Sequence, residues 1–203
     1  MTMWNCSILR IGPIDSENGN AAALRSAITN HFNRDTSCEP SSLSSRAENS
    51  PYDLLAISNR YFDANILLSG LDDSLNEVSI NGESVPLLQE DGIIIVFDGS
   101  ISSSFDTMGQ HHSTAMQNDH CGDLLRLCIG VTHGPSPLSD GSKQSEEEYS
   151  RRVLWCLDRG YEYVEVDLTP EGMTRGFDER DKDGFARVIE AISTCMWSSH
   201  VMK

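Results

Sequence analysis

The sequence predicts an α/β fold, with a six-stranded, mostly parallel sheet, one antiparallel hairpin and helices on both faces. Three observations predict it. Apolar runs of strand length alternate along the chain with segments of helical periodicity. Two runs, residues 52–58 and 62–69, are separated by only a few residues, which indicates an antiparallel hairpin. Two others, residues 92–98 and 124–131, are continuous and apolar, as strands buried on both faces are.

The first half of the chain contains the predicted strand 6–11, then the helix 21–32, and then the hairpin. One face of this helix collects its apolar side chains with a histidine: Leu24, Ala27, Ile28, His31 and Phe32. The segment 34–51 is rich in Ser and has no periodicity, which predicts a mobile loop within the domain.

In the second half, residues 103–108 could begin a helix, and residues 109–122 read as a loop. A helix is predicted over 145–160, with Ser145 as N-cap, Glu148 completing a capping box and Gly160 as the C′ residue. An alternating strand, 161–167, follows. The last helix falls within residues 183–197, and its apolar stripe is Phe185, Val188, Ile189, Ile192 and Met196.

Length and charge restrict the function. The 203 residues predict a single domain over 1–203. The net charge of −16 argues against nucleic acid and anionic membranes as main partners. No apolar run approaches membrane-spanning length, and residues 1–5 do not begin a secretory signal, so we expect a cytosolic protein. Six scattered cysteines without a CxxC pair indicate reduced thiols rather than disulfides or zinc: Cys6, Cys38, Cys121, Cys128, Cys156 and Cys195.

The order of the predicted elements is that of the small-GTPase domain, a P-loop NTPase-type fold. Residues 95–105, IVFDGSISSSF, resemble its fourth strand and the turn that follows, because an apolar run ends in Asp98 and small residues lead to Phe105. The resemblance implies a phosphate loop between the first strand and the first helix.

That loop lacks the residues that bind phosphate and magnesium in GxxxxGK[ST]. Gly12 and Gly19 are separated by six residues rather than four. Asn20 stands in the place of the lysine, and Ala21 in the place of the hydroxyl residue. We therefore expect these four positions to keep the shape of the loop without binding nucleotide.

The segments that correspond to the other nucleotide-binding motifs of small GTPases also differ from those motifs. Asp15 and Glu17 add negative charge beside the expected phosphates. Leu67 occupies the position of the DxxG aspartate, the segment 131–135 has no base-reading aspartate, and 167–170 replaces the SAK-like turn. The sequence therefore predicts neither nucleotide binding nor hydrolysis, with no catalytic residue, no metal and no cofactor.

The last third of the chain carries five short motifs: Trp155-Cys156, Gly160-Tyr161, Val164-Glu165, Trp197-Ser198 and Val201-Met202-Lys203. They resemble motifs of the alpha- and gamma-adaptin-binding protein family, in which a Trp-Cys helix leads through a Gly-aromatic turn into a Glu-Val strand. The closing helix of that family then runs into Trp-Ser and Val-Met-Lys.

The resemblance implies a pseudoGTPase domain, that is, a GTPase-like fold without GTPase function. Such proteins are cytosolic assembly chaperones for the clathrin adaptors AP-1 and AP-2 in vesicle trafficking. They hold the large α or γ adaptin and the small sigma subunit until the heterotetramer forms. Relatives carry a further C-terminal helical region that contacts the large subunit, so a sigma contact is the safer expectation for this domain.

Two alternatives stay open beside this reading. One is a divergent small GTPase that still binds guanine nucleotide and acts as a trafficking switch. The other is an enzyme with an unrelated cleft, although no Ser/His/Asp or Cys/His spacing supports one. Three histidines could suggest a metal, but a polar loop explains them better: His111, His112 and His120.

Three apolar residues beyond the last helix are candidates for partner binding: Trp197, Val201 and Met202. The competing interpretation is that they pack the end of the helix onto the sheet.

Overall fold

The computed structural model describes residues 6–13, 19–34, 52–71, 78–80, 83–85, 90–115 and 125–203. Its elements follow in the order β1 (Ser7–Pro13), α1 (Gly19–Arg34), β2 (Tyr52–Ser58), β3 (Phe62–Gly70), β4 (Val78–Ile80), β5 (Glu83–Val85), β6 (Glu90–Asp98), α2 (Ser102–Ala115), β7 (Leu125–Thr132), α3 (Lys143–Leu157), β8 (Glu162–Asp167), α4 (Gly184–Thr194) and β9 (Val201–Met202). The predicted mobile segment 34–51 lies outside the described residues except for Arg34, which ends α1.

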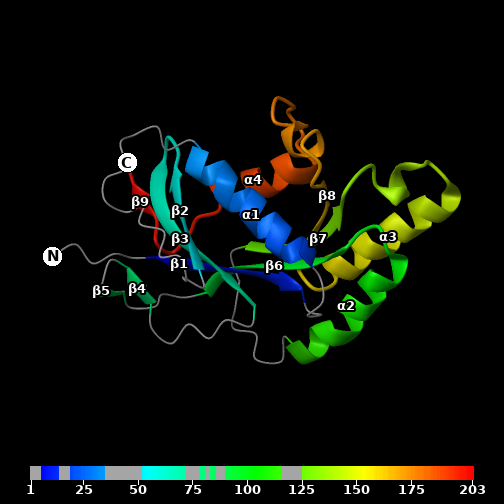
Figure 1. Cartoon of the computed structure of the whole chain (residues 1–203), viewed down its shortest axis with the longest axis horizontal. Coiled ribbons are helices and arrows are strands. Elements are labelled where there is room, and N and C mark those ends of the chain that lie inside the picture. Colours follow the sequence, from blue (N-terminus) through cyan, green and yellow to red (C-terminus); the bar gives the residue numbers. More distant parts are fainter. Residues whose placement is uncertain are drawn as a thin grey trace.

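One large sheet contains the six predicted strands in the order β2-β3-β1-β6-β7-β8 (Figure 1). β1, β3, β6, β7 and β8 run parallel, and β2 pairs with β3 as the predicted antiparallel hairpin. Two strand pairings in the structure are not predicted by the sequence pattern. β9 joins β3 antiparallel as a seventh strand, and β4 and β5 form a separate two-stranded sheet.

Two apolar layers fix the helices to opposite faces of the sheet, which confirms the predicted arrangement (Figure 1). α1 and α4 cover one face, where Leu24 and Ile192 are fully buried. α2 and α3 cover the other face, where Phe105 and Cys156 meet Ile95. Because both faces are covered, the central strands read as continuous apolar runs.

α2 is longer than predicted and includes residues 109–115, the first half of the segment that reads as a loop. Phe105, Met108 and His112 recur at helical spacing and are buried on one face. The His112 ring packs edge-on against Trp155 and Tyr161, with centroids 5.2 and 5.5 Å away. A histidine that packs as an aromatic residue therefore extends the stripe through a polar sequence.

α3 begins before the predicted capping box. Its N-cap is Ser142, whose Oγ accepts a hydrogen bond from the backbone N–H of Ser145 at 3.2 Å. Glu148 binds Arg152 and Arg151 instead of the N-cap. The predicted C′ residue, Gly160, is confirmed. It has a φ of +73°, and its N–H donates to Leu157 O while the next N–H donates to Cys156 O, as in a Schellman motif.

The predicted stripe of the last helix is confirmed except at Met196. Phe185, Val188, Ile189 and Ile192 are buried, whereas Met196 lies beyond the end of α4 and is half exposed. The chain leaves the helix at Cys195, whose backbone is extended.

Candidate functional site

The expected phosphate-loop residues lie where β1 ends and α1 begins. Gly12 is in β1, where a Cβ would come within 3.2 Å of the Leu71 side chain. Gly19 is the exposed first residue of α1, and Asn20 and Ala21 are buried in its first turn. The positions of Asp15 and Glu17 lie outside the described residues.

Asn20 is held by a histidine from another loop. Its Oδ1 accepts a hydrogen bond from Nε2 of His133, 3.0 Å away, when that ring nitrogen carries the proton. His133 follows β7, in the segment where a small GTPase would read the base. The residue in the lysine position thus links the first turn of α1 to the segment after β7, at the edge where parallel strands end, the usual ligand crevice of such sheets.

The residues at the positions of the other GTPase motifs make contacts within the fold. Leu67 is buried and packs with Cys6, with Leu54 against them. The carbonyl of Gly70, at the end of β3, accepts a hydrogen bond from Arg10 Nη1 at 3.1 Å. In the segment after β8, Asp167 Oδ1 accepts the backbone N–H of Thr169 at 2.9 Å.

The histidines considered for a metal are not gathered together in the described residues. His112 is buried, and its Nε2 lies 3.2 Å from the hydroxyl of Tyr161. His111 is exposed, and His120 lies outside the described residues. Within the described ranges, no three His, Cys, Asp or Glu side chains are close enough to share a metal ion.

Of the three candidate partner residues, Trp197 is fully buried. Its Nε1 donates a hydrogen bond to the carbonyl of Ile192 at 2.9 Å, and its ring lies over β6, where a Cβ at Gly92 would come within 3.2 Å of it. Trp197 thus packs the end of α4 onto the sheet, as the competing interpretation expected. Val201 and Met202, in contrast, are 67% and 63% exposed.

The residues after Trp197 are bound to the start of the sheet. The buried carboxylate of Asp91 accepts the backbone N–H and the hydroxyl of Ser198, at 2.7 and 2.8 Å. Ser199 donates its backbone N–H to Ser7 Oγ at 3.0 Å and its hydroxyl to the carbonyl of Asn65 at 2.8 Å. The Trp-Ser motif therefore docks the tail.

Lys203 fastens the last residues to the β2–β3 turn. Its Nζ donates to Ser58 Oγ and to the Asn59 carbonyl and pairs with Asp63 at 2.9 Å. The hydrogen bond from Lys203, with that from Ser58, lowers the pKa of the Asp63 carboxyl below its usual range.

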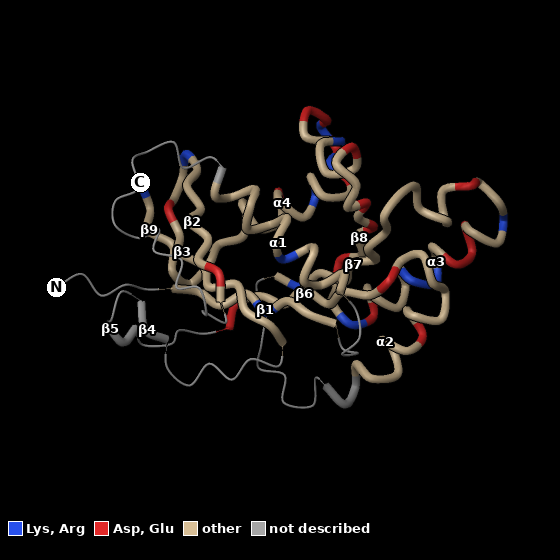
Figure 2. The backbone as a smooth tube through the Cα atoms, viewed as in Figure 1, with Lys and Arg blue, Asp and Glu red and all other residues tan. Residues whose placement is uncertain are grey.

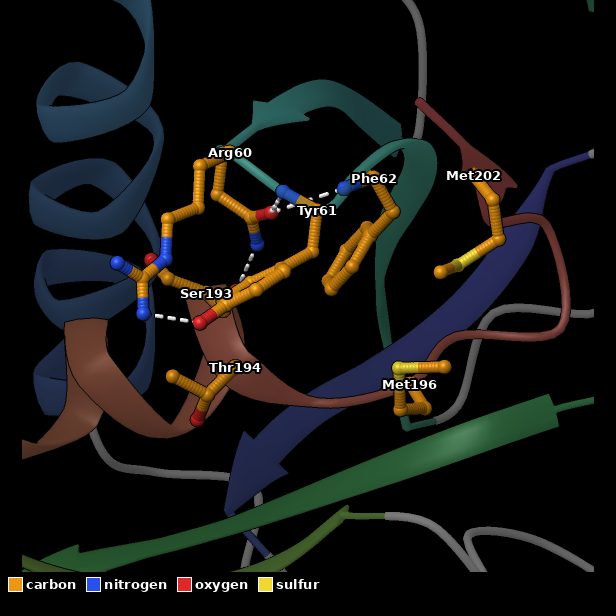
Figure 3. A pocket seen from close by; sticks show the side chains of 8 residues that line it. Arg60, Tyr61, Phe62, Ser193, Thr194, Met196 and Met202 are labelled. Carbon is orange, nitrogen blue, oxygen red and sulfur yellow. Dashed lines mark hydrogen bonds between the residues drawn. The ribbon is translucent and has the colours of Figure 1, made fainter.

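A pocket of about 520 Å³ opens between this turn, the end of α4 and β9 (Figure 3). It lies at the edge where the parallel strands begin, opposite the degenerate phosphate loop. In Figure 3, Tyr61 and Phe62 point toward one side of it, and Met196 and Met202 toward the other. The lining residues are Asn59, Arg60, Tyr61, Phe62, Ser193, Thr194, Met196 and Met202.

Asn59 sets the direction of the turn. Its Oδ1 accepts the backbone N–H groups of Tyr61 and Phe62, at 2.8 and 3.0 Å, while its Nδ2 donates to the Ser193 carbonyl of α4. The turn is thereby held against the helix end, with Arg60 and Tyr61 exposed. Arg60 and Tyr61 were not predicted as site residues. The sequence signal that could have indicated them is a tyrosine within a predicted turn.

No helix in the described parts of the chain has the length and apolar character needed to cross a membrane. No protein-family model matches the chain. The chain is similar to the alpha- and gamma-adaptin-binding protein p34 of Pongo abelii, with 26% identity over 149 residues, which is 72% of this chain. It matches 41% of the length of that relative. This similarity supports the family to which the C-terminal motifs point, the alpha- and gamma-adaptin-binding proteins.

Proposed function

We propose that this chain is a non-catalytic, GTPase-like module that binds subunits of the clathrin adaptors AP-1 and AP-2 in the cytosol. The small sigma subunit is its expected contact, and its role is that of an assembly chaperone in vesicle trafficking. The observation that carries adaptin binding is the similarity to the adaptin-binding protein p34 over 72% of the chain.

The order of elements and of strands supports a GTPase-like fold, and the contacts of Asn20 and Leu67 support the non-catalytic interpretation. A phosphate-binding lysine supplies a positive charge that reaches the terminal phosphates. Asn20 has no charge to supply, and its amide is engaged with His133. Leu67, in the position of a magnesium-binding aspartate, is 1% exposed in an apolar cluster and offers no oxygen ligand.

Binding is tested with the purified chain and a complex of an adaptin with its sigma subunit, passed together over a gel-filtration column without nucleotide. We expect the two to co-elute at a larger size than either alone. Isolated sigma subunit in a parallel run identifies the subunit that is contacted. Separate elution in both runs would refute adaptor binding.

Nucleotide binding is tested by calorimetric titration of GTP with Mg²⁺ into nucleotide-free protein. We expect no binding heat up to high micromolar nucleotide, because the lysine, hydroxyl and aspartate positions hold Asn20, Ala21 and Leu67. Saturable binding would instead favour the divergent GTPase that acts as a trafficking switch.

A further inference from the structure

The pocket between the β2–β3 turn, α4 and β9 combines apolar walls with one exposed cation. Eight large apolar side chains are exposed among the described residues, and four of them belong to this region: Tyr61, Met196 and Met202 line the pocket, and Val201 precedes Met202 in β9. Each of the four is more than half exposed. A cluster of this kind next to a cavity is typical of an interaction surface.

The polar groups of the wall are already bonded within the fold. The carbonyl of Ser193 accepts the amide of Asn59 at 3.1 Å, and the hydroxyl of Thr194 donates to the carbonyl of Glu190 at 2.8 Å. An occupant therefore has apolar surface to contact, with few polar groups left to satisfy. Methionine walls adapt to apolar side chains of different shape.

Arg60 supplies the charge at the rim. Its guanidinium lies 4.4 Å over the Tyr61 ring and donates to the Tyr61 hydroxyl, and it has no carboxylate partner among the described residues. The other cation nearby, Lys203, is paired with Asp63. In a chain of net charge −16, the one charged residue among the described residues that line this pocket is Arg60, at the tip of the β2–β3 hairpin (Figure 2).

We propose that this pocket is where the adaptor subunit docks, through a segment that places an apolar side chain between Tyr61 and Met202 and a carboxylate beside Arg60. The inference rests on the proposed function. Charge complementarity selects the occupant, because an acidic chain repels most carboxylates but offers here a cation that no carboxylate of the described residues pairs with.

The apolar part of the contact is tested with a pair of matched variants. Met196→Glu places a carboxylate in the pocket, and Leu154→Glu places one on the exposed face of α3, where the leucine is 61% exposed. We expect Met196→Glu to weaken binding of the adaptin–sigma complex at least ~10-fold by calorimetry. Leu154→Glu should stay within about twofold of wild type.

The electrostatic part is tested with Arg60→Glu and the control Lys143→Glu, which reverses a charge at an exposed position of α3. Arg60→Glu should weaken binding ~10-fold and reduce its dependence on salt, whereas Lys143→Glu should behave as wild type. Circular dichroism and melting temperature check that each variant folds. Hydrogen exchange on the wild-type complex should show protection at residues 59–62, 194–196 and 201–203.

The outcomes separate the two proposals. If wild type binds and all four variants bind equally, the pocket is not the docking site, while adaptor binding stands. If wild type does not bind, both proposals fail. If wild type is a dimer that Met196→Glu dissociates, the occupant is a second copy of the chain and the inference is overturned.

Discussion

At the scale of single residues, burial separates the three apolar residues that were candidates for partner binding. Trp197 is fully buried and its indole N–H is satisfied, while Met202, five residues later, is 63% exposed. Burial of the Trp197 ring over β6 stabilises the fold, since burying an aromatic side chain contributes ~2–3 kcal/mol to the free energy of folding. Trp197 is therefore a packing residue of the fold, and Met202 is an exposed residue available to a partner.

Trp197→Ala should destabilise the fold by about 3–5 kcal/mol, because it removes the ring between α4 and the sheet and leaves a cavity. The measurement is the free energy of unfolding in urea. Met196→Ala is the control, because this neighbour is 52% exposed, and it should change the free energy by no more than ~0.5 kcal/mol. Equal effects of the two substitutions would contradict the described packing.

The ion pairs of Glu148 predict how the free energy of unfolding depends on pH. The hydrogen bond from Arg151, with a further one from the buried Arg152, lowers the pKa of the Glu148 carboxyl below its usual 4.5. A lowered pKa in the folded state stabilises the protein above the unfolded pKa, and that stability is lost as pH falls through the folded pKa. Glu148→Gln should therefore be less stable than wild type at pH 7, and the difference should disappear at lower pH.

Urea unfolding at a series of pH values below 7 measures this difference. Glu146→Gln removes the same charge from an exposed position of α3 and serves as the control. A difference between wild type and Glu148→Gln that persists at the lowest pH would show that the carboxylate pairs do not cause it.

At the scale of elements, apolar runs predicted the strands within one or two residues at most ends, whereas helix ends were less certain. β6 and β7 each contain a long apolar run, which located them in the sequence, although β6 begins two residues before its run, at Glu90. The start of α3 was misplaced because two serines, Ser142 and Ser145, both offer a capping hydroxyl. Local pattern does not decide between them, because the contact of Ser145 Oγ with the Pro137 carbonyl is tertiary.

The end of α3 depends on Gly160, whose φ of +73° disfavours any residue with a Cβ. Gly160→Ala should cost about 1 kcal/mol in unfolding free energy, although no atom lies within 4 Å of the added methyl group. The matched control is Gly19→Ala, which also enters open space but has no positive φ, and it should be neutral or slightly stabilising. A neutral Gly160→Ala would contradict the left-handed conformation.

At the scale of the whole molecule, the pocket could not be predicted from the sequence. Its walls come from the β2–β3 turn, the end of α4 and β9, which lie together only in the folded chain. Met202 pairs with Phe62 across most of the chain, and no local pattern announces a two-residue strand such as β9. The degenerate phosphate loop could be read from the residue types at Asn20 and Ala21. The link from Asn20 to His133 could not be predicted, because it depends on the start of α1 and the segment after β7 meeting at one edge of the sheet.

A substitution at Asp91 tests whether its carboxylate holds the residues after Trp197 to the sheet. Asp91→Ala removes the carboxylate that holds Ser198 and leaves that N–H without its acceptor, so it should cost about 1.5–3 kcal/mol. Chymotrypsin should then cleave after Trp197 faster than in wild type, as the tail detaches. Asp181→Ala, at an exposed position, should leave both the unfolding free energy and the cleavage rate unchanged.

The bond between Ser7 and Ser199 also constrains how the protein comes to be folded. It joins residues 192 positions apart, and the first strand of the sheet meets the final turn there. During synthesis, β1 emerges long before Ser199, which binds Ser7 at the start of that strand. Contacts so distant along the chain form slowly, so the native state is completed only after residue 199 has left the ribosome.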